Sequence, residues 1–421
     1  MRTSKSSTSA AVTLTIIALT LTGLITPKRA SSQTETVVHA FQSTEKYDGF
    51  SPNAPLIADA KGNLYGTTAT GGEHGWGIVF KLAPPSAPGG TWTENVLYSF
   101  TGGSDGGFPS PGQLLLKGGS LYGTAAQGGA NGVGVVFELS PGKPWVETVL
   151  YSFTTSAGYG FTPSSGLTQG SKGTFYGTTF KGGAHKQGVV YRLSPPTGGG
   201  AWTEAPIYAF KGGSTDGSEP GNNLIIDSTG SLYGVTLVAP GTAFKLTPSG
   251  TGAWTETVLY TFNPAIEGPP NSSLVFDSTG ALYGVTNSNG ASGGTVFQLT
   301  PPTGGGAWTK NTLYSFQGSP SNDGATPTGA IFDSTGALYG STQYGGTNAN
   351  CGVVGCGTIF KLSPPSAPGG DWTEQVLYSF LWGTDGAYAD TQLLLLGTTF
   401  YGETADGGGQ ANAGTVFSFT P

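Results

Sequence analysis

One unit recurs seven times along this chain, and the repeat restricts the possible folds more than any other feature. Each copy contains the tripeptide Leu-Tyr-Gly or Phe-Tyr-Gly. The tripeptides end at Gly66, Gly123, Gly177, Gly234, Gly284, Gly340 and Gly402. Self-similarity at a fixed period is the signature of architectures in which copies of one small unit stack on their neighbours.

Four short segments recur in each unit. They are an apolar run such as 56–59, the Leu-Tyr-Gly segment, a Gly-Thr-Val-Phe-Lys-Leu segment and a Trp-Thr-Glu-x-Val-Leu-Tyr-Ser-Phe segment. All are rich in β-branched or aromatic residues and bounded by Gly, Pro, Asn or Asp, which is typical of strands. Four strands repeated seven times predict an all-β fold, a seven-bladed β-propeller. A β-solenoid is the alternative, but its coils are much shorter than this repeat.

The order of the segments predicts how the ring closes. Asp-Gly-x-x-Pro follows the Leu-Tyr-Ser-Phe segment, as at 48–52, and we interpret it as the crossing between blades because Gly and Pro interrupt a strand. In this register the chain begins with an unpaired fourth strand, 36–41, and ends with a third strand, 415–419. We expect these two strands to pair in blade seven and to close the ring.

Composition excludes several classes of protein. The 73 Gly and 28 Pro and the 10% of charged residues do not suit a helical bundle or a nucleotide-binding α/β enzyme. Aromatic residues make up 11%, which indicates a folded chain rather than a disordered one. The 17 Lys and Arg against 24 Asp and Glu make the chain acidic, so we expect no nucleic-acid partner.

The N-terminus has the three-part pattern of a secretory signal peptide. Arg2 and Lys5 precede a largely apolar run at 10–25, and small residues follow at 30–32. A membrane anchor is the alternative, but the run is short for a span. We therefore predict a signal peptide at 1–32 and a repeat propeller at 33–421. The mature protein is expected to be secreted or on the cell surface, without a membrane span and as a monomer.

Residues that recur in every blade are predicted to serve the scaffold. The tyrosine of Leu-Tyr-Gly is assigned to the core between sheets, and hairpin acids such as Asp59 and Asp227 are assigned to turns. Tryptophans such as Trp92 either stack on sugars or cover the adjacent blade, and we favour the second role. A ring of acids in the crossings either binds a cation or caps backbone N–H groups, and we favour capping. These acids are Asp48, Asp105, Asp216, Glu267, Asp323 and Asp385.

Catalytic and metal-binding signatures are sparse. His39 takes the tyrosine position of Leu-Tyr-Ser-Phe and is interpreted as structural, whereas His74 and His185 lie in loops without a clustered third ligand. We therefore predict no metal site and no cofactor. Cys351 and Cys356, the two cysteines, are expected to form a disulfide rather than a metal site, since a metal would need two further ligands.

The repeat motifs resemble a known family. Leu-Tyr-Gly-Thr-Thr-x-x-Gly-Gly, Gly-Thr-Val-Phe-Lys-Leu and Leu-Tyr-Ser-Phe are similar to those of the choice-of-anchor tandem repeat GloVer-containing proteins, over about residues 34–421. These are exported bacterial repeat proteins. The resemblance implies export and a C-terminal sorting or anchoring tail, and it implies no particular activity. This sequence stops at Pro421, two residues after the last expected strand.

Three functions remain open at this point. The favoured hypothesis is a non-catalytic module that binds a glycan or a protein outside the cell. The alternatives are an extracellular carbohydrate-active hydrolase or lyase with acids at the channel mouth, and a structural repeat of the cell envelope. Function on a repeated scaffold is expected where the copies differ. The candidate ligand residues, placed on one face and mostly in one sector, are Trp76, Trp382, Tyr47, His74 and Tyr344. Packing of these rings within their own loops is the alternative.

Overall fold

The computed structural model describes residues 34–42, 48–87, 89–250, 252–287, 293–304, 306–318, 321–367 and 369–421. The predicted signal peptide at 1–32 and the candidate ligand residue Tyr47 lie outside these ranges. In the described ranges, no helix is long and apolar enough to span a bilayer.

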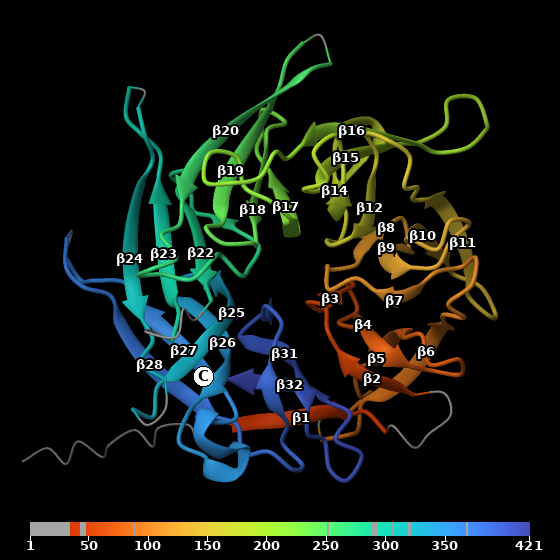
Figure 1. The fold of residues 1–421 in the computed structure, drawn as a ribbon. Helices are drawn as coiled ribbons and strands as arrows, with labels where there is room; N and C mark the ends of the chain where they lie inside the picture. The colour runs from red at the N-terminus through yellow and green to blue at the C-terminus, as the bar shows by residue number, and fades with distance from the viewer. Residues whose placement is uncertain are drawn as a thin grey trace, which may run out of the picture. The chain divides into compact units, whose positions relative to one another are not determined.

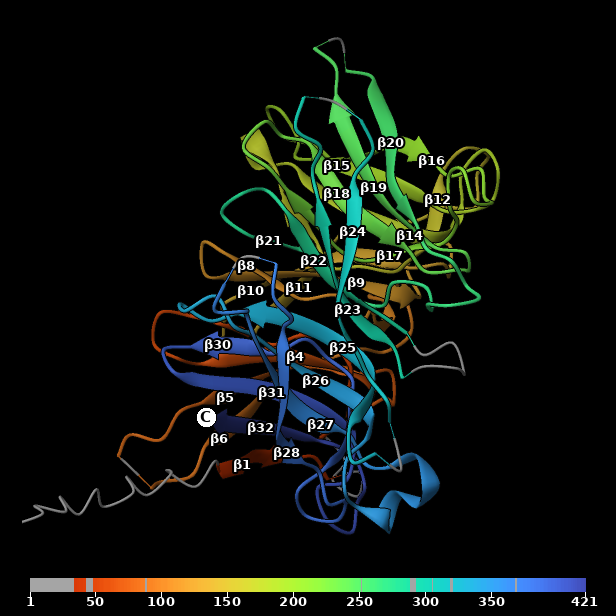
Figure 2. The same ribbon diagram turned by 90° about the vertical axis from the view of Figure 1, so that its left-hand side faces the viewer.

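Seven antiparallel sheets, the blades, are arranged in a ring, which confirms the predicted β-propeller (Figure 1). Figure 2 shows the same strands from the side. Blade 1 consists of β2 (Gly49–Pro52), β3 (Ile57–Ala58), β4 (Leu64–Gly71), β5 (Ile78–Ala83) and β6 (Thr93–Ser99). Blade 2 consists of β7 (Gly107–Pro109), β8 (Leu115–Lys117), β9 (Ser120–Gln127), β10 (Val135–Ser140) and β11 (Val146–Ser152). Blade 3 consists of β12 (Gly160–Pro163), β13 (Thr168–Gln169), the short 3-10 helix η1 (Ser171–Gly173), β14 (Phe175–Gly182), β15 (Val189–Ser194) and β16 (Thr203–Ala209).

The remaining blades repeat this order. Blade 4 consists of β17 (Pro220–Ile226), β18 (Leu232–Thr236), β19 (Thr242–Pro248) and β20 (Trp254–Thr261). Blade 5 consists of β21 (Val275–Phe276), β22 (Leu282–Thr286), β23 (Thr295–Thr300) and β24 (Thr309–Ser315). Blade 6 consists of β25 (Gly324–Phe332), β26 (Leu338–Gly345), the 3-10 segment η2 (Ala349–Val354), β27 (Thr358–Ser363) and β28 (Thr373–Ser379). Blade 7 consists of β29 (Ala387–Ala389), β30 (Leu394–Leu396), β31 (Thr399–Asp406), β32 (Thr415–Thr420) and β1 (Thr34–Ala40).

The inner strand begins earlier than the sequence suggests. Residues 49–52, interpreted above as part of a crossing, pair with β4 through Gly49–Gly71 and Pro52–Thr68. The inner strand is an edge of its sheet, and an edge tolerates proline because it needs hydrogen bonds on one side only. Ser51 within β2 has φ of 57°, and the break between β2 and β3 lies at residues 53–56.

The ring closes through the two chain ends, as predicted. Strand β1 pairs with β32 from Thr34–Thr420 to Ala40–Thr415, with a bulge between Val37 and His39. Blade 7 is therefore built from both ends of the propeller unit, and its outermost strand is the first strand of the chain (Figure 1).

Aromatic side chains fill the space between neighbouring blades. Each Leu-Tyr-Ser-Phe segment, or the segment at the same position of a blade, ends in a phenylalanine. This phenylalanine makes an edge-to-face contact with an aromatic ring in the Gly-Thr-Val-Phe-Lys-Leu strand of the next blade. Phe100 of blade 1, for example, lies 5.1 Å from Phe137 of blade 2, and Phe41 lies 5.2 Å from Phe80 across the closure. Such pairs add about 0.5–1.5 kcal/mol beyond the buried area. The contact recurs at all seven interfaces, so each blade depends on the next.

Candidate functional site

Side chains in or next to the inner strands connect five blades to the next blade around the centre of the ring. Asn53 Nδ2 of blade 1 donates to the Pro109 carbonyl at 3.2 Å, and Ser110 Oγ of blade 2 donates to the Pro163 carbonyl at 2.8 Å. Ser164 and Asn271 make the equivalent bonds from blades 3 and 5, and Thr328 of blade 6 donates to the Thr391 carbonyl of blade 7. A hydroxyl or amide donor at this position therefore serves the scaffold in five blades.

A cavity of about 220 Å³ lies where these inner strands meet. Six of the seven blades contribute to its wall, and most of the lining side chains carry a hydroxyl, amide or carboxyl group. The lining residues are Asn53, Pro55, Pro111, Asn222, Asn223, Leu237, Asn271, Ser272, Ser273, Thr328, Asp390, Thr391 and Gln392. We call this cavity the axial pocket.

Blade 7 differs from the other blades at the axial pocket. Asp390 occupies the position at which Asn53 or Ser110 donates a hydrogen bond, and its Oδ1 is buried without a partner among the described residues. Burial, together with Asp406, raises the pKa of Asp390 to about 8. The adjacent Thr391 is 3% exposed, and its Oγ1 has no partner in the described part of the chain. The wall of the pocket at blade 7 thus carries unused hydrogen-bonding groups.

A second unusual acid lies behind Asp390. Glu403 on β31 stands at the position held by Thr67 in blade 1, is fully buried, and has both carboxylate oxygens unpartnered among the described residues. Its Oε1 approaches Gly66 so closely that a Cβ there would lie 3.0 Å away. Burial, with a further contribution from Asp390, raises the pKa of Glu403 well above its ordinary value. Burial therefore favours the protonated form of both acids.

Trp76, one of the predicted ligand residues, packs between blades 1 and 2. Its ring lies 4.9 Å from Phe108 in an edge-to-face contact and covers the backbone of Gly102 and Gly107. The Trp76 carbonyl also accepts a 2.9 Å hydrogen bond from the Phe108 N–H. These contacts support the packing alternative for Trp76. His74 beside it is exposed.

Trp382 and Tyr344 lie in a different group, between blades 6 and 7. Each contacts Tyr388, with ring centroids 5.6 Å and 5.5 Å apart respectively. Tyr388 and Phe108 hold equivalent places, because both donate their N–H to a loop carbonyl of the preceding blade. The structure thus brings Trp382 and Tyr344 together through Tyr388, and it places Trp76 in a separate cluster.

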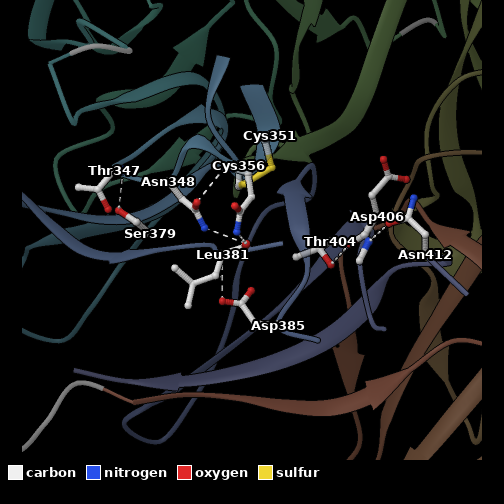
Figure 3. The surroundings of a disulfide bond; sticks show 12 residues. Thr347, Asn348, Cys351, Cys356, Ser379, Leu381, Asp385, Thr404, Asp406 and Asn412 are labelled. Atoms are coloured by element: carbon white, nitrogen blue, oxygen red, sulfur yellow. Dashed lines mark hydrogen bonds between the residues drawn. A yellow bond between two sulfur atoms is a disulfide. The ribbon is translucent and has the colours of Figure 1, made fainter. Parts of the chain in front are cut away.

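The predicted disulfide between Cys351 and Cys356 is confirmed, with Cα atoms 5.2 Å apart. The clipped loop is also held to the crossing that leads into blade 7, because Asn348 Nδ2 and Asn350 Nδ2 both donate to the Leu381 carbonyl (Figure 3). Disulfides persist in oxidising compartments, so this bond suits an exported protein.

Alkylation under denaturing, non-reducing conditions is expected to leave Cys351 and Cys356 unmodified in protein collected from its native compartment. Reduction should lower the unfolding temperature only slightly, since the disulfide closes a short loop. Mass spectrometry before and after reduction measures the first expectation. Two alkylated cysteines in the unreduced sample would contradict it.

The crossing acids cap the backbone, as the favoured interpretation held. Asp105 Oδ2 accepts from the Thr101 N–H at 2.8 Å and from the Tyr98 hydroxyl at 3.0 Å. In the same way, Asp323 Oδ2 accepts hydrogen bonds from the Gln317 N–H and from the Tyr314 hydroxyl. The outer tryptophans likewise cover adjacent blades: Trp92 of blade 1 lies 5.9 Å from Tyr401 of blade 7.

Several of these capping acids are faced by a glutamate on the outer strand of the next blade. Glu147 of β11 faces Asp105, and Glu374 of β28 faces Asp323. Burial and the neighbouring aspartate raise the pKa of each glutamate to about 7. For Glu35, burial and Asp385 raise the pKa to about 8. These pairs of acids at blade interfaces are stable when one member is protonated, because two adjacent buried charges repel.

Two solved structures of similar fold provide a comparison. A putative 6-phosphogluconolactonase from Bacteroides uniformis is 12% identical at a TM-score of 0.50, and the match covers 79% of this chain and 93% of that chain. The periplasmic gluconolactonase of Pseudomonas aeruginosa is 15% identical at a TM-score of 0.50, with 78% of this chain and 86% of that chain covered. At this identity the likeness shows the fold alone. A comparison with curated proteins found no match.

The repeats themselves match a family model. The model is described as the Gloeobacter/Verrucomicrobia repeat, and it matches residues 23–239 and 207–417. The two matches together span most of the chain and include the Leu-Tyr-Gly segments of all seven blades. The chain therefore belongs to the Gloeobacter/Verrucomicrobia repeat family.

Proposed function

We propose that this propeller is an exported binding module, and that its ligand is a small polyhydroxylated molecule such as one sugar unit of a glycan, held in the axial pocket. The observation that carries the proposal is the wall of that pocket. Amide, hydroxyl and carboxyl groups from six blades line it, and Asp390 Oδ1 and Thr391 Oγ1 lack partners within the described ranges. Buried polar groups are ordinarily hydrogen-bonded, so unpaired ones at a cavity indicate a missing partner.

The size and chemistry of the pocket limit the ligand. Its volume of about 220 Å³ is below the range of about 300–1,000 Å³ that is usual for drug-sized ligands. A single sugar ring carries hydroxyls that both donate and accept, which suits the mixture of Asn, Ser, Thr and Asp side chains. Pro55, Pro111 and Leu237 supply apolar surface for the C–H face of such a ring. The disulfide supports the exported location.

The loop aromatics predicted from the sequence offer an alternative position for a ligand. The group of Trp382, Tyr388 and Tyr344 presents aromatic surface for a sugar, although each ring also packs against another. The axial pocket is favoured because Asp390 Oδ1 and Thr391 Oγ1 on its wall have no hydrogen-bond partner among the described residues, whereas the Trp76 ring fills a gap between two blades.

A hydrolase remains the second candidate function, and Asp390 on the pocket wall favours it. Glycoside hydrolysis needs two carboxyl groups, one of which is protonated as the general acid. Asp390 meets the second condition, since burial raises its pKa to about 8, and it lies on the pocket wall. This candidate differs from a binding module in one measurable respect, which is cleavage of the bound sugar.

The test is an array of immobilised glycans probed with the mature protein, residues 33–421. We expect binding to a limited set that shares one terminal or internal sugar unit, with inhibition by the free monosaccharide. Each glycan that binds is then incubated with the protein at pH 5 and pH 7 and analysed for products. Intact glycan supports a binding module, and cleavage that is lost in Asp390→Asn supports the hydrolase. Absence of any glycan binding would contradict the proposal.

A further inference from the structure

The interface at which the ring closes differs chemically from its counterparts. At four other interfaces a tyrosine hydroxyl donates a hydrogen bond to the aspartate that caps the crossing. A glutamate on the outer strand of the next blade faces this tyrosine–aspartate pair. These groups are Tyr98, Asp105 and Glu147; Tyr208, Asp216 and Glu256; Tyr314, Asp323 and Glu374; and Tyr378, Asp385 and Glu35. A fifth interface replaces the glutamate by Lys310, which forms an ion pair with Glu267.

His39 replaces the tyrosine at the closure. Its ring packs edge-on against Phe41 with centroids 4.7 Å apart, much as Tyr98 packs on Phe100 at 5.1 Å. The imidazole does not take over the hydrogen bond of the tyrosine, however. His39 Nε2 lies 3.8 Å from Asp48 Oδ1, beyond hydrogen-bonding distance, and it is buried without a hydrogen-bond partner in the described part of the chain.

Three potential metal ligands converge at this point. One ligand atom each from His39, Asp48 and Glu94 lies within 4.8 Å of the other two. His39 lies in β1, Asp48 directly precedes β2 at the end of the crossing into blade 1, and Glu94 lies in β6. We propose that His39, Asp48 and Glu94 bind a divalent transition-metal ion of the zinc class at the closure of the ring.

The donor set suits such an ion. Zinc is bound by His nitrogen at about 2.0–2.1 Å and by carboxylate oxygen at about 2.0–2.2 Å, and three protein ligands leave a fourth position for water. The separation of 3.8 Å between His39 Nε2 and Asp48 Oδ1 is close to that of two ligands on one ion. Asp48 is also oriented by the N–H groups of Gln42 and Gly49, at 2.6 Å and 2.7 Å, as ligating carboxylates commonly are. The His39 side chain is 19% exposed, which leaves a path for the ion.

Such an ion links the closing strand to two segments of blade 1. The three ligands are adjacent only when β1 is paired in blade 7, so the metal binds the closed ring and stabilises it by mass action. The inference concerns stability of the scaffold and is independent of the proposed sugar site.

The experiment compares three metal-free forms of the mature protein with and without Zn²⁺ at pH 7.5. The parent is expected to bind one zinc ion by mass analysis and to unfold several degrees higher in zinc than in chelator. His39→Tyr restores the residue that the other interfaces use, so it should fold as well as the parent in chelator and lose the zinc shift. The chain has three histidines. The double variant of the exposed His74→Ala and His185→Ala retains only His39 and should keep the full shift.

Two results would overturn the proposal. One is a parent protein without a zinc-dependent shift, and the other is a His39→Tyr protein that keeps the shift of the parent. Glu94→Gln provides a check on the ligand set, because loss of one charged ligand should weaken zinc affinity at least tenfold while the metal-free unfolding temperature changes little. Unchanged zinc affinity in Glu94→Gln would contradict the assignment of Glu94 as a ligand.

Discussion

Deleting residues 33–42 is expected to lower the unfolding temperature of the mature protein by roughly 5–10 °C and to cause aggregation. The deletion removes β1, which pairs with β32 over its whole length, and leaves β32 as an exposed edge strand. It also removes Phe41, which is fully buried and packs edge to face on Phe80 across the closure. Loss of a buried phenylalanine alone typically costs about 3–5 kcal/mol. Calorimetry and light scattering measure the two effects.

A rearranged chain provides the control for this deletion. Thr34 pairs with Thr420, so the two ends of blade 7 are adjacent. Residues 34–42 can therefore be moved behind Thr420 and joined by a short Gly-rich loop, as the third and fourth strands are joined in other blades. This permuted protein should regain most of the lost stability. A deletion variant that is as stable and monomeric as the parent would contradict the expectation, since it would show that pairing of β1 with β32 contributes little to the stability of the propeller.

Raising the pH from 5 to 8 in the presence of chelator is expected to lower the unfolding temperature substantially. Burial raises the pKa of Glu147, Glu204, Glu256 and Glu374 to about 7 and that of Glu35 to about 8, against an ordinary value of 4.5. The folded protein therefore holds more protons than the unfolded chain between about pH 4.5 and pH 8. Stability falls with rising pH wherever the folded state binds more protons. The stabilisation by these protonated glutamates is fully present below pH 4.5, and it is lost as the pH rises through their raised pKa values of about 7 to 8.

Substitution identifies the groups responsible. Replacing Glu147 and Glu374 by Gln removes two of the titrations, so the double variant should unfold at a higher temperature than the parent at pH 8 and should show a shallower pH dependence. Asp371→Asn, at an exposed position, is the matched control and should leave the slope unchanged. An unfolding temperature that is equal or higher at pH 8 than at pH 5 would contradict the role of the acid pairs.

The fold was predictable because each copy repeats the same local signals. Seven Leu-Tyr-Gly segments, the hairpin turns and the unpaired terminal strands together determine the number of blades and the way in which the ring closes. The start of the inner strand differs from the sequence-based prediction, since Pro52 and the neighbouring glycines resemble a loop. An edge strand accommodates Pro52 and the positive φ of Ser51, and sequence patterns do not show which strand is an edge.

The axial pocket was not anticipated, although the sequence contains a signal for it. Asp390 and Glu403 depart from positions held by hydroxyl or amide residues in most copies, and aligning the copies residue by residue would have revealed both. The sequence pattern favours aromatic residues in loops instead, because exposed rings are common in sugar sites. Whether the Trp76 ring faces solvent or fills a gap depends on Phe108, which belongs to the next blade and is distant from Trp76 in the sequence.

Titration calorimetry with the sugar identified on the array distinguishes the axial pocket from the loop face as the binding site. The parent, Thr391→Val and Asp390→Asn are compared with Trp76→Ala and Trp382→Ala, all at one pH and after melting curves have established folding. Thr391 Oγ1 makes no hydrogen bond within the described chain, so valine should preserve the fold. We expect each axial variant to weaken binding about tenfold, which corresponds to one lost hydrogen bond, and the two tryptophan variants to bind like the parent. Unchanged affinity in both axial variants, with loss of roughly 1–3 kcal/mol in the tryptophan variants, would contradict the axial site and place the ligand on the loop face.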